Sequence, residues 1–387
     1  MMNLSAKRRF TTIFSLGLCS LLAACGWWPY EQSTTTNYTT TPPPPGSFSQ
    51  TYTASLTAGE VVEMGINTAT MTYTFKVLLS SYSLAGTSGK GQMTSQNPDG
   101  SFNLAASADG FIQGGKIYAV KNGTLSGYIS ATFTSGTYNV PVIGTSNTVK
   151  SIPNLAGTYN YVSFSCPTRS NGNYQASTSG CLSDYGTIKI NTVGTYAFVR
   201  CSKEDLTTIT TCSSQTTGTL APAQSQSTPA TNLAGVYNFT PGGAAANSAW
   251  IFGYTAANGN KVAVIDFNDA RTGGYGYGYG QAILTSQLTV SASDIAGNYA
   301  LFNLIDGEKK TSIQGTGYSS VMSSGIPTGS LNLNIPWTGM TTWTDSTSTP
   351  SGYALIAGTG VFASQMSVAP TSTYSFTNKW FEFGIKH

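Results

Sequence analysis

Histidine is almost missing from this sequence. The 387 residues include a single one, His387, at the last position. Serine and cysteine nucleophiles usually depend on an imidazole as general base, so Ser-His-Asp and Cys-His catalysis are excluded. The patterns S-x-x-K and G-x-S-x-G and a Walker A sequence are missing as well. We therefore expect no enzyme and no cofactor.

Charge is also scarce. Charged residues make up 9% of the chain, against about 25% in an ordinary globular domain. Gly (43), Tyr (22) and Phe (17) are plentiful, which excludes coiled coils, helical bundles and charge-driven disorder. Residues 1–24 hold three of the 18 basic residues and none of the 15 acidic ones. The rest of the chain is formally neutral, so no nucleic-acid partner is expected.

The N-terminus has the layout of a bacterial export signal. Lys7-Arg8-Arg9 precede an apolar run from Phe10 to Leu22, which is too short to span a bilayer. The sequence Leu22-Ala23-Ala24-Cys25 that follows resembles the lipobox of bacterial lipoproteins. The resemblance implies that residues 1–24 are a signal peptide and that Cys25 carries acyl chains such as palmitate.

The lipobox also implies a location in the cell. Gly26 follows the cysteine, and by resemblance to sorted lipoproteins this favours the outer membrane, with the body facing the periplasm or the cell surface. Two or more acyl chains hold a protein stably on a membrane. Residues 25–50, which include the proline run Pro42–Pro45, are expected to form a disordered tether.

The remaining chain shows the signals of strands and turns. Thr68 to Leu78 alternates in polarity with a β-rich composition. Asn122-Gly123 and Asn258-Gly259 each lie between apolar runs, which is the strongest short hairpin signal. We predict an all-β protein whose antiparallel meanders form sandwich- or barrel-like modules, with a solvated hairpin tip at Glu308-Lys309-Lys310.

A short motif, [ND]-[LI]-A-G-x-Y, occurs three times. The copies begin at Asn154, Asn232 and Asp294, and the unequal spacing argues against a regular propeller or solenoid. The copies fit either repeated β-modules or three strand-entry corners of one sandwich or barrel. With a low-complexity linker at Ala221–Thr231, the predicted modules are residues 51–150, 151–230 and 231–387.

Four cysteines remain beyond the anchor, all inside the second predicted module: Cys166, Cys181, Cys201 and Cys212. An even number in an exported protein indicates disulfides. Three pairings are open, and we favour Cys166–Cys181 with Cys201–Cys212 because each closes a polar loop between strand-like runs. Without a CxxC pair or an internal histidine, no metal site is expected.

The one aromatic stripe in the sequence is Tyr275, Tyr277 and Tyr279, which alternate with glycines. On a strand their side chains share one face, where they could stack on sugar rings or on a protein partner, or simply pack across strands. Asp266 and Asp269 just before the stripe are the best local pair for sugar hydrolysis or calcium ligation. Turn capping and a surface ion pair are the simpler reading.

The lipobox, the tether, the repeats and the four-cysteine module together resemble a family of proteobacterial lipoproteins, domain of unknown function 2957. The resemblance implies a β-rich envelope lipoprotein and supplies no activity. The leading hypothesis is a lipid-anchored, non-enzymatic protein with a binding, adhesive or structural role and a glycan or protein partner. The alternatives are a carbohydrate-binding or glycan-cleaving module and an accessory subunit of an outer-membrane assembly.

Overall fold

The structure is a computed structural model. It describes residues 46–166, 182–201, 214–226, 229–242, 249–256, 258–267, 279–303, 307–321, 328–345, 350–356, 360–366 and 381–387. The predicted signal peptide, Cys25 and most of the predicted tether lie outside these residues. So do Cys181, Cys212, Asp269, Tyr275 and Tyr277.

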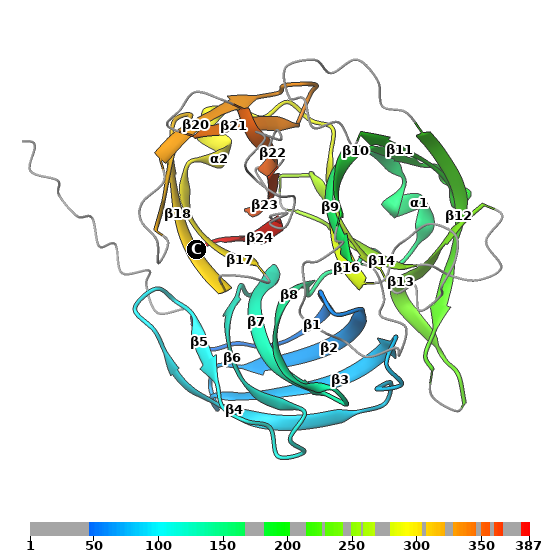
Figure 1. Cartoon of the computed structure of the whole chain (residues 1–387). Coiled ribbons are helices and arrows are strands. Elements are labelled where there is room, and N and C mark those ends of the chain that lie inside the picture. Colours follow the sequence, from blue (N-terminus) through cyan, green and yellow to red (C-terminus); the bar gives the residue numbers. More distant parts are fainter. Residues whose placement is uncertain are drawn as a thin grey trace, which may run out of the picture. The chain divides into compact units, whose positions relative to one another are not determined.

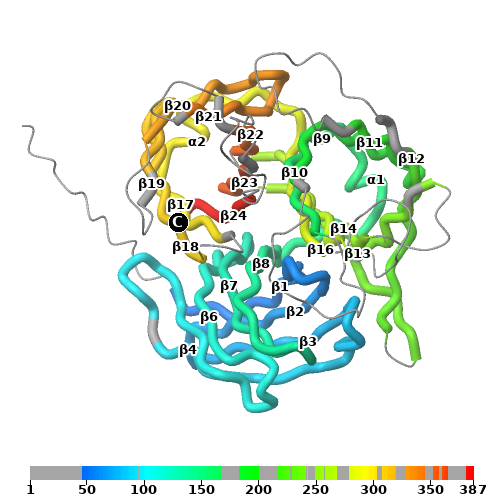
Figure 2. The backbone as a smooth tube through the Cα atoms, in the orientation of Figure 1, coloured from blue at the N-terminus to red at the C-terminus, as the bar shows by residue number. Residues whose placement is uncertain are grey.

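The described chain folds into three closed barrels of eight strands (Figure 1). Each strand pairs antiparallel with its neighbours in sequence, and the last strand of each barrel pairs with the first. Figure 2 traces this path in chain order, one barrel after the next. The all-β, barrel-like prediction is confirmed.

Barrel 1 consists of β1 (Ser49–Leu56), β2 (Glu60–Asn67), β3 (Thr72–Ser80), β4 (Ser88–Gln96), β5 (Phe102–Leu104), β6 (Ile112–Ala119), β7 (Thr124–Phe133) and β8 (Gly136–Thr145). Barrel 2 consists of β9 (Gly157–Cys166), β10 (Leu182–Ile190), β11 (Thr195–Cys201), β12 (Ser214–Gln224), β13 (Asn232–Pro241), β14 (Ala249–Thr255), β15 (Lys261–Phe267) and β16 (Tyr279–Ser286). Barrel 3 consists of β17 (Gly297–Asn303), β18 (Gly307–Gln314), β19 (Gly317–Val321), β20 (Thr328–Leu333), β21 (Thr341–Asp345), β22 (Pro350–Ile356), β23 (Val361–Met366) and β24 (Phe381–Lys386).

Both Asn-Gly hairpin predictions are confirmed. Asn122 lies between β6 and β7 with a φ of 54°, and Gly259 lies between β14 and β15 with a φ of 84°. Asparagine and glycine adopt this left-handed region more readily than other residues, which lets the chain reverse within a tight loop.

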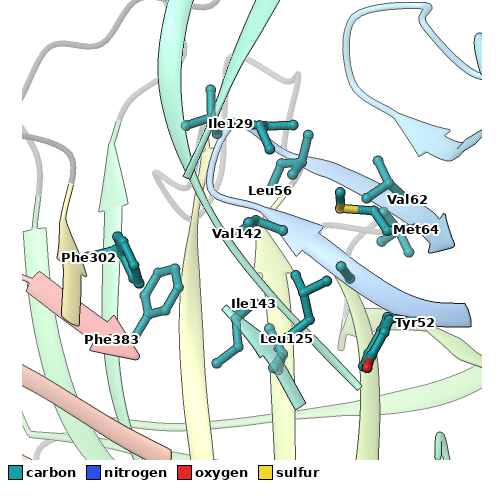
Figure 3. Packing of buried hydrophobic residues seen from close by; sticks show 14 of the residues in the cluster. Tyr52, Leu56, Val62, Met64, Leu125, Ile129, Val142, Ile143, Phe302 and Phe383 are labelled. Carbon is teal, nitrogen blue, oxygen red and sulfur yellow. The ribbon is translucent and has the colours of Figure 1, made fainter. Parts of the chain in front are cut away.

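The barrels are filled by their own side chains. Because alternate residues of a strand face inward, Tyr52 and Ala54 of β1 meet Met64 and Val62 of β2 inside barrel 1. All four are buried in the same hydrophobic cluster, and Figure 3 shows Tyr52, Val62 and Met64 packed there. Barrels 2 and 3 have separate cores built in the same way.

Some strands are buried on both faces because the barrels pack against one another. In β9 the last eight residues are all buried. Its inward side chains, such as Tyr161, belong to the core of barrel 2, whereas Phe164 stacks on Phe381 of barrel 3 with ring centroids 5.9 Å apart. The cluster that fills barrel 1 also contains Val264 of barrel 2 and Phe302 of barrel 3. A continuous apolar run therefore marks a barrel wall that faces another barrel.

The barrel limits differ from the predicted module boundaries at one place. Barrel 1 ends at Thr145, close to the predicted boundary near residue 150. The predicted boundary near residue 230 falls inside barrel 2, between β12 and β13, which pair with each other. The low-complexity stretch begins inside β12, where Ala223 is buried and the register shifts between Pro222 and Gln224.

Two of the three motif copies begin barrels. The copies at Asn154 and Asp294 contribute to a single helical turn, α1 (Ile152–Leu155) and α2 (Ala292–Ile295), followed directly by β9 and β17. Tyr159 and Tyr299 then point inward, and each hydroxyl donates to the carbonyl oxygen four residues earlier, Leu155 and Ile295. The middle copy lies in β13, where Tyr237 donates to the Val149 carbonyl at 3.3 Å.

Candidate functional sites at the barrel junctions

Asp266 lies on the wall of barrel 2 that faces barrel 1. In β15, Ala263 and Ile265 belong to the core of barrel 2, while Val262 and Val264 belong to the cluster shared with barrel 1. Asp266 continues the second set by alternation, and its exposed fraction is 0%. A fully buried aspartate cannot reach a polysaccharide in solvent.

A chain of hydrogen bonds connects Asp266 to barrel 1. The Ser55 hydroxyl on β1 donates to Asp266 Oδ2 at 2.7 Å, and Gln281 Nε2 on β16 donates to Ser55 Oγ at 2.5 Å. Thr57 Oγ1 donates to Gln281 Oε1 at 3.0 Å. All these groups are buried, so the network is a specific polar contact within an apolar junction.

Glu60 is a second buried carboxyl group at this junction. It begins β2 with an exposed fraction of 0%, and Ser80 Oγ donates to its Oε1 at 3.2 Å. Its other oxygen, Oε2, and Oδ1 of Asp266 are both buried without a hydrogen-bond partner. Among the described residues, no lysine, arginine or histidine forms an ion pair with either carboxyl group.

The surroundings of both carboxyl groups oppose ionisation. Burial raises the pKa of Glu60 well above its ordinary value, and the nearby negative charge of Asp266 raises it further, against the hydrogen bond from Ser80. Burial also raises the pKa of Asp266 well above its ordinary value, against the hydrogen bond from Ser55. The pair thus holds protons at pH values where exposed carboxyl groups are ionised.

The predicted tyrosine stripe can be followed only at Tyr279. It begins β16, is 4% exposed and belongs to the cluster shared with barrel 1. Asp266 and Tyr279 are therefore both buried, and neither offers a surface to a sugar ring. Tyr275, Tyr277 and Asp269 lie outside the described residues, so a ligand role for them stays a prediction.

Barrel 1 meets barrel 3 through a different polar cluster. Lys116 Nζ on β6 lies 3.1 Å from Asp99 Oδ2 and 2.7 Å from Glu308 Oε2 of β18. Lys310 Nζ lies 2.9 Å from Asp99 Oδ2, and the Tyr118 hydroxyl contacts Asp99 and Glu308 at 2.9 and 2.8 Å. This cluster supplies two ammonium groups for its two carboxylates.

The lysines determine the ionisation of this cluster. Burial raises the pKa of Asp99, but hydrogen bonds from Ser101, Lys310 and Tyr118 more than offset it, and the net pKa is well below the ordinary value. Burial lowers the pKa of Lys116, but its bonds to Glu308 and Asp99 outweigh this and leave the pKa raised. Both partners are held in their charged forms.

The single histidine lies beside this cluster. The ring of His387 is 5.1 Å from the ring of Tyr118, and its backbone N–H donates to the Asn298 carbonyl at 3.0 Å. Burial lowers its pKa. The side chains near it, Asp99, Lys116 and Glu308, are already paired with one another, and no serine or cysteine hydroxyl or thiol is among its contacts in the described chain.

The predicted hairpin tip at Glu308-Lys309-Lys310 is wrong for two of its residues. Glu308 belongs to the cluster above, and Lys309 faces the interior of barrel 3, since it pairs with the core residue Leu301. Lys309 Nζ lies 2.9 Å from Glu382 Oε2, and Ser364 Oγ donates to Glu382 Oε1 at 2.8 Å. Lys310 alone is exposed.

The outer wall of barrel 1 carries an open groove of about 670 Å³. Glu63 on β2 pairs across the strands with Lys76 on β3, and Lys90 on β4 pairs with Thr74. These side chains and Asp109 line the groove. It is a solvent-facing surface with charges of both signs.

Among the cysteines, Cys166 is disulfide-bonded at the end of β9. The favoured pairings with Cys181 and between Cys201 and Cys212 stay predictions. The described residues contain no group of three or more His, Cys, Asp or Glu side chains arranged for a metal ion. No helix in the described part of the chain is long and apolar enough to cross a membrane.

Comparisons with known proteins identify no family. No family model and no curated protein matches this chain. One solved structure, the vaccine antigen transferrin-binding protein B from Haemophilus parasuis, is 9% identical with a TM-score of 0.24, over 84% of this chain and 65% of that chain. The intact Ap-TbpB is also 9% identical with a TM-score of 0.17, over 84% of this chain and 66% of that one. The chain spans about two thirds of these proteins' length, and a likeness this weak supports nothing about function.

The sequence did not predict that Glu60 lies near Asp266 or that Asp99 and Glu308 share Lys116. A signal was present for Asp266, which is the only charged residue in the apolar run from Val262 to Phe267. A charge inside such a run indicates a strand that is buried on both faces. Of the partners of Asp99, Lys310 comes from another barrel, and nothing local in the sequence points to it.

Proposed function

We propose that this chain is a lipid-anchored protein of the cell envelope with a non-enzymatic binding role. The lipobox at Cys25 supports the anchor. The observation that carries the binding role is the construction of the barrels: inward positions are filled by large side chains such as Tyr52, Tyr159 and Tyr299, all with an exposed fraction of 0%. Barrels packed in this way are rigid supports, and recognition falls to their outer surfaces and loops.

The burial of Asp266 argues against the glycan-cleaving alternative. A glycosidase needs two carboxyl groups that reach the glycosidic oxygen from solvent, whereas Asp266 and Glu60 are sealed between barrels. The groove with Glu63, Lys76, Lys90 and Asp109 is an accessible concave surface instead. Its mixed charges suit a polar macromolecular partner.

The anchor is tested by Cys25→Ser in the intact cell, with Cys19→Ser as the matched control within the apolar segment. We expect the first variant to leave the detergent phase or to remain unprocessed, and the control to fractionate and incorporate palmitate like the wild type. Normal acylation and membrane retention of Cys25→Ser would contradict the anchor.

The binding role is tested by photo-crosslinking in cells. A photoreactive amino acid replaces Lys76 or Lys90 in the groove, and Lys189, an exposed residue of barrel 2, serves as control. The proposal expects a crosslinked product of discrete mass from the groove positions only. Equal crosslinking at Lys189, or hydrolysis of a polysaccharide by the purified protein, would contradict it.

A further inference from the structure

The contact between barrels 1 and 2 places two carboxyl groups where the barrels touch. Ser55 of β1 reaches Asp266 of β15 at 2.7 Å, and a Cβ added to Gly59, next to Glu60, would lie 3.2 Å from the Phe267 carbonyl oxygen. The backbones are thus close at this point. An ionised carboxyl group at this point cannot keep its hydration water while the barrels stay in contact.

The other titratable groups at this contact supply no positive charge. Tyr82, after β3, lies near both carboxyl groups, and Tyr279, on β16, lies near Tyr82. Burial raises the pKa of Tyr82, and the neighbouring Glu60 raises it further, so this phenol stays neutral at physiological pH. The hydrogen-bonding side chains at this contact are uncharged: Ser55, Ser80, Thr57, Gln226 and Gln281.

Each carboxyl group has one oxygen that accepts a hydrogen bond and one that has no partner. The bonded oxygens are Asp266 Oδ2 and Glu60 Oε1, and the oxygens without a partner are Asp266 Oδ1 and Glu60 Oε2. A protonated carboxyl group carries its proton on one oxygen and accepts on the other. An ionised pair would leave two buried negative oxygens without a partner, which costs more than leaving two neutral oxygens without one.

We propose that Glu60 and Asp266 form a proton-operated latch, which closes barrel 1 on barrel 2 while the pair holds its protons and loosens as the protons are lost. Opening the contact returns both groups to water, where carboxyl pKa values are near 4. Because the closed state binds protons more tightly than the open state, the closed contact is fully favoured below about pH 4 and weakens as the pH rises.

The test is hydrogen exchange of the full-length protein between pH 5 and 8, corrected for intrinsic exchange. Protection of peptides from β1, β15 and β16 is expected to fall with rising pH, by up to about tenfold per pH unit where opening releases one proton. Protection of β20 in barrel 3, an internal reference, is expected to stay constant.

Two variants and one control sharpen the test. Glu60→Gln together with Asp266→Asn removes both titrating groups, and we expect protection of β1 and β15 to become independent of pH. Glu63→Gln on the same strand removes an exposed, outward-facing carboxyl group and should keep the wild-type dependence. Glu60→Gln alone should reduce the dependence.

Three outcomes would overturn the latch. They are wild-type protection that does not change between pH 5 and 8, the wild-type dependence persisting in the double variant, and protection at pH 8 that calcium restores and a chelator removes. The last would mean that a cation, not protons, neutralises the pair. The pH dependence of protection in the wild-type protein tests the latch even if a variant does not fold.

Discussion

The two polar junctions of barrel 1 hold carboxyl groups in opposite ionisation states. Toward barrel 2, Glu60 and Asp266 meet hydroxyls and an amide, and their pKa values are raised. Toward barrel 3, Asp99 meets Lys116 and Lys310, and its pKa is lowered. The difference comes from the partners, since burial by itself raises the pKa of any carboxyl group.

The comparison teaches that the two junctions respond to pH with opposite signs. A raised carboxyl pKa stabilises the contact at low pH, and this contribution is lost as the pH rises above the ordinary value near 4. A lowered pKa stabilises the contact above that value, and this contribution is lost in acid. The contact of barrel 1 with barrel 2 is thus stabilised by acidic pH, and its contact with barrel 3 by neutral pH.

The largest effect is expected from Lys116→Met, which removes the ammonium group shared by Asp99 and Glu308. The change removes a hydrogen bond to each of two partly buried carboxylates and should destabilise the fold by about 3 kcal/mol. Urea unfolding at pH 7 measures it. Lys76→Met, on the outer wall of barrel 1, is the control and should change stability by no more than about 0.5 kcal/mol.

A smaller loss is expected from Tyr118→Phe. The hydroxyl contacts two charged carboxylates, and hydrogen bonds to charged groups contribute about 1.5–3 kcal/mol. Tyr52→Phe removes a bond to the uncharged Val120 carbonyl and should cost only about 0.5–1.5 kcal/mol. Equal losses in the same urea experiment would mean that the cluster toward barrel 3 is not ionised.

The smallest effect, a gain, is expected from Glu60→Gln at pH 8. Because the fold raises the pKa of Glu60, removing this titrating group should stabilise the protein at pH 8. At pH 4 the same variant should show no gain. Loss of stability at pH 8 would show that Glu60 is held as an anion.

Local features of the fold were predictable from the sequence, and the contacts between barrels were not. Asn122-Gly123 and Asn258-Gly259 gave their hairpins because the turn depends on the residues inside it. The extent of each barrel was harder to predict from the sequence. Closure of barrel 2, for example, depends on pairing between β9 and β16, which lie more than a hundred residues apart. The motif at Asn232 looks like those that begin barrels, yet it lies inside one.

The candidate site shows the same limit. Asp266 was selected as a partner of Asp269 just before the tyrosine stripe. Its burial was not predicted, because its neighbour in space, Ser55, is 211 residues away. Glu308 and Lys309 were predicted to be solvated because their partners, too, are distant in the sequence. The exposure of an outward-facing residue depends on what covers the barrel wall. The sequence of the strand indicates such a cover only through the length of its apolar run.

Hydrogen exchange at both junctions of one wild-type sample, from pH 3 to pH 8, tests the central claim most directly. We predict that protection of β15 relative to β20 falls as the pH rises, while protection of β6 relative to β20 falls as the pH drops below about 4. Parallel changes at β15 and β6, or none at either, would contradict the opposite ionisation of the two junctions.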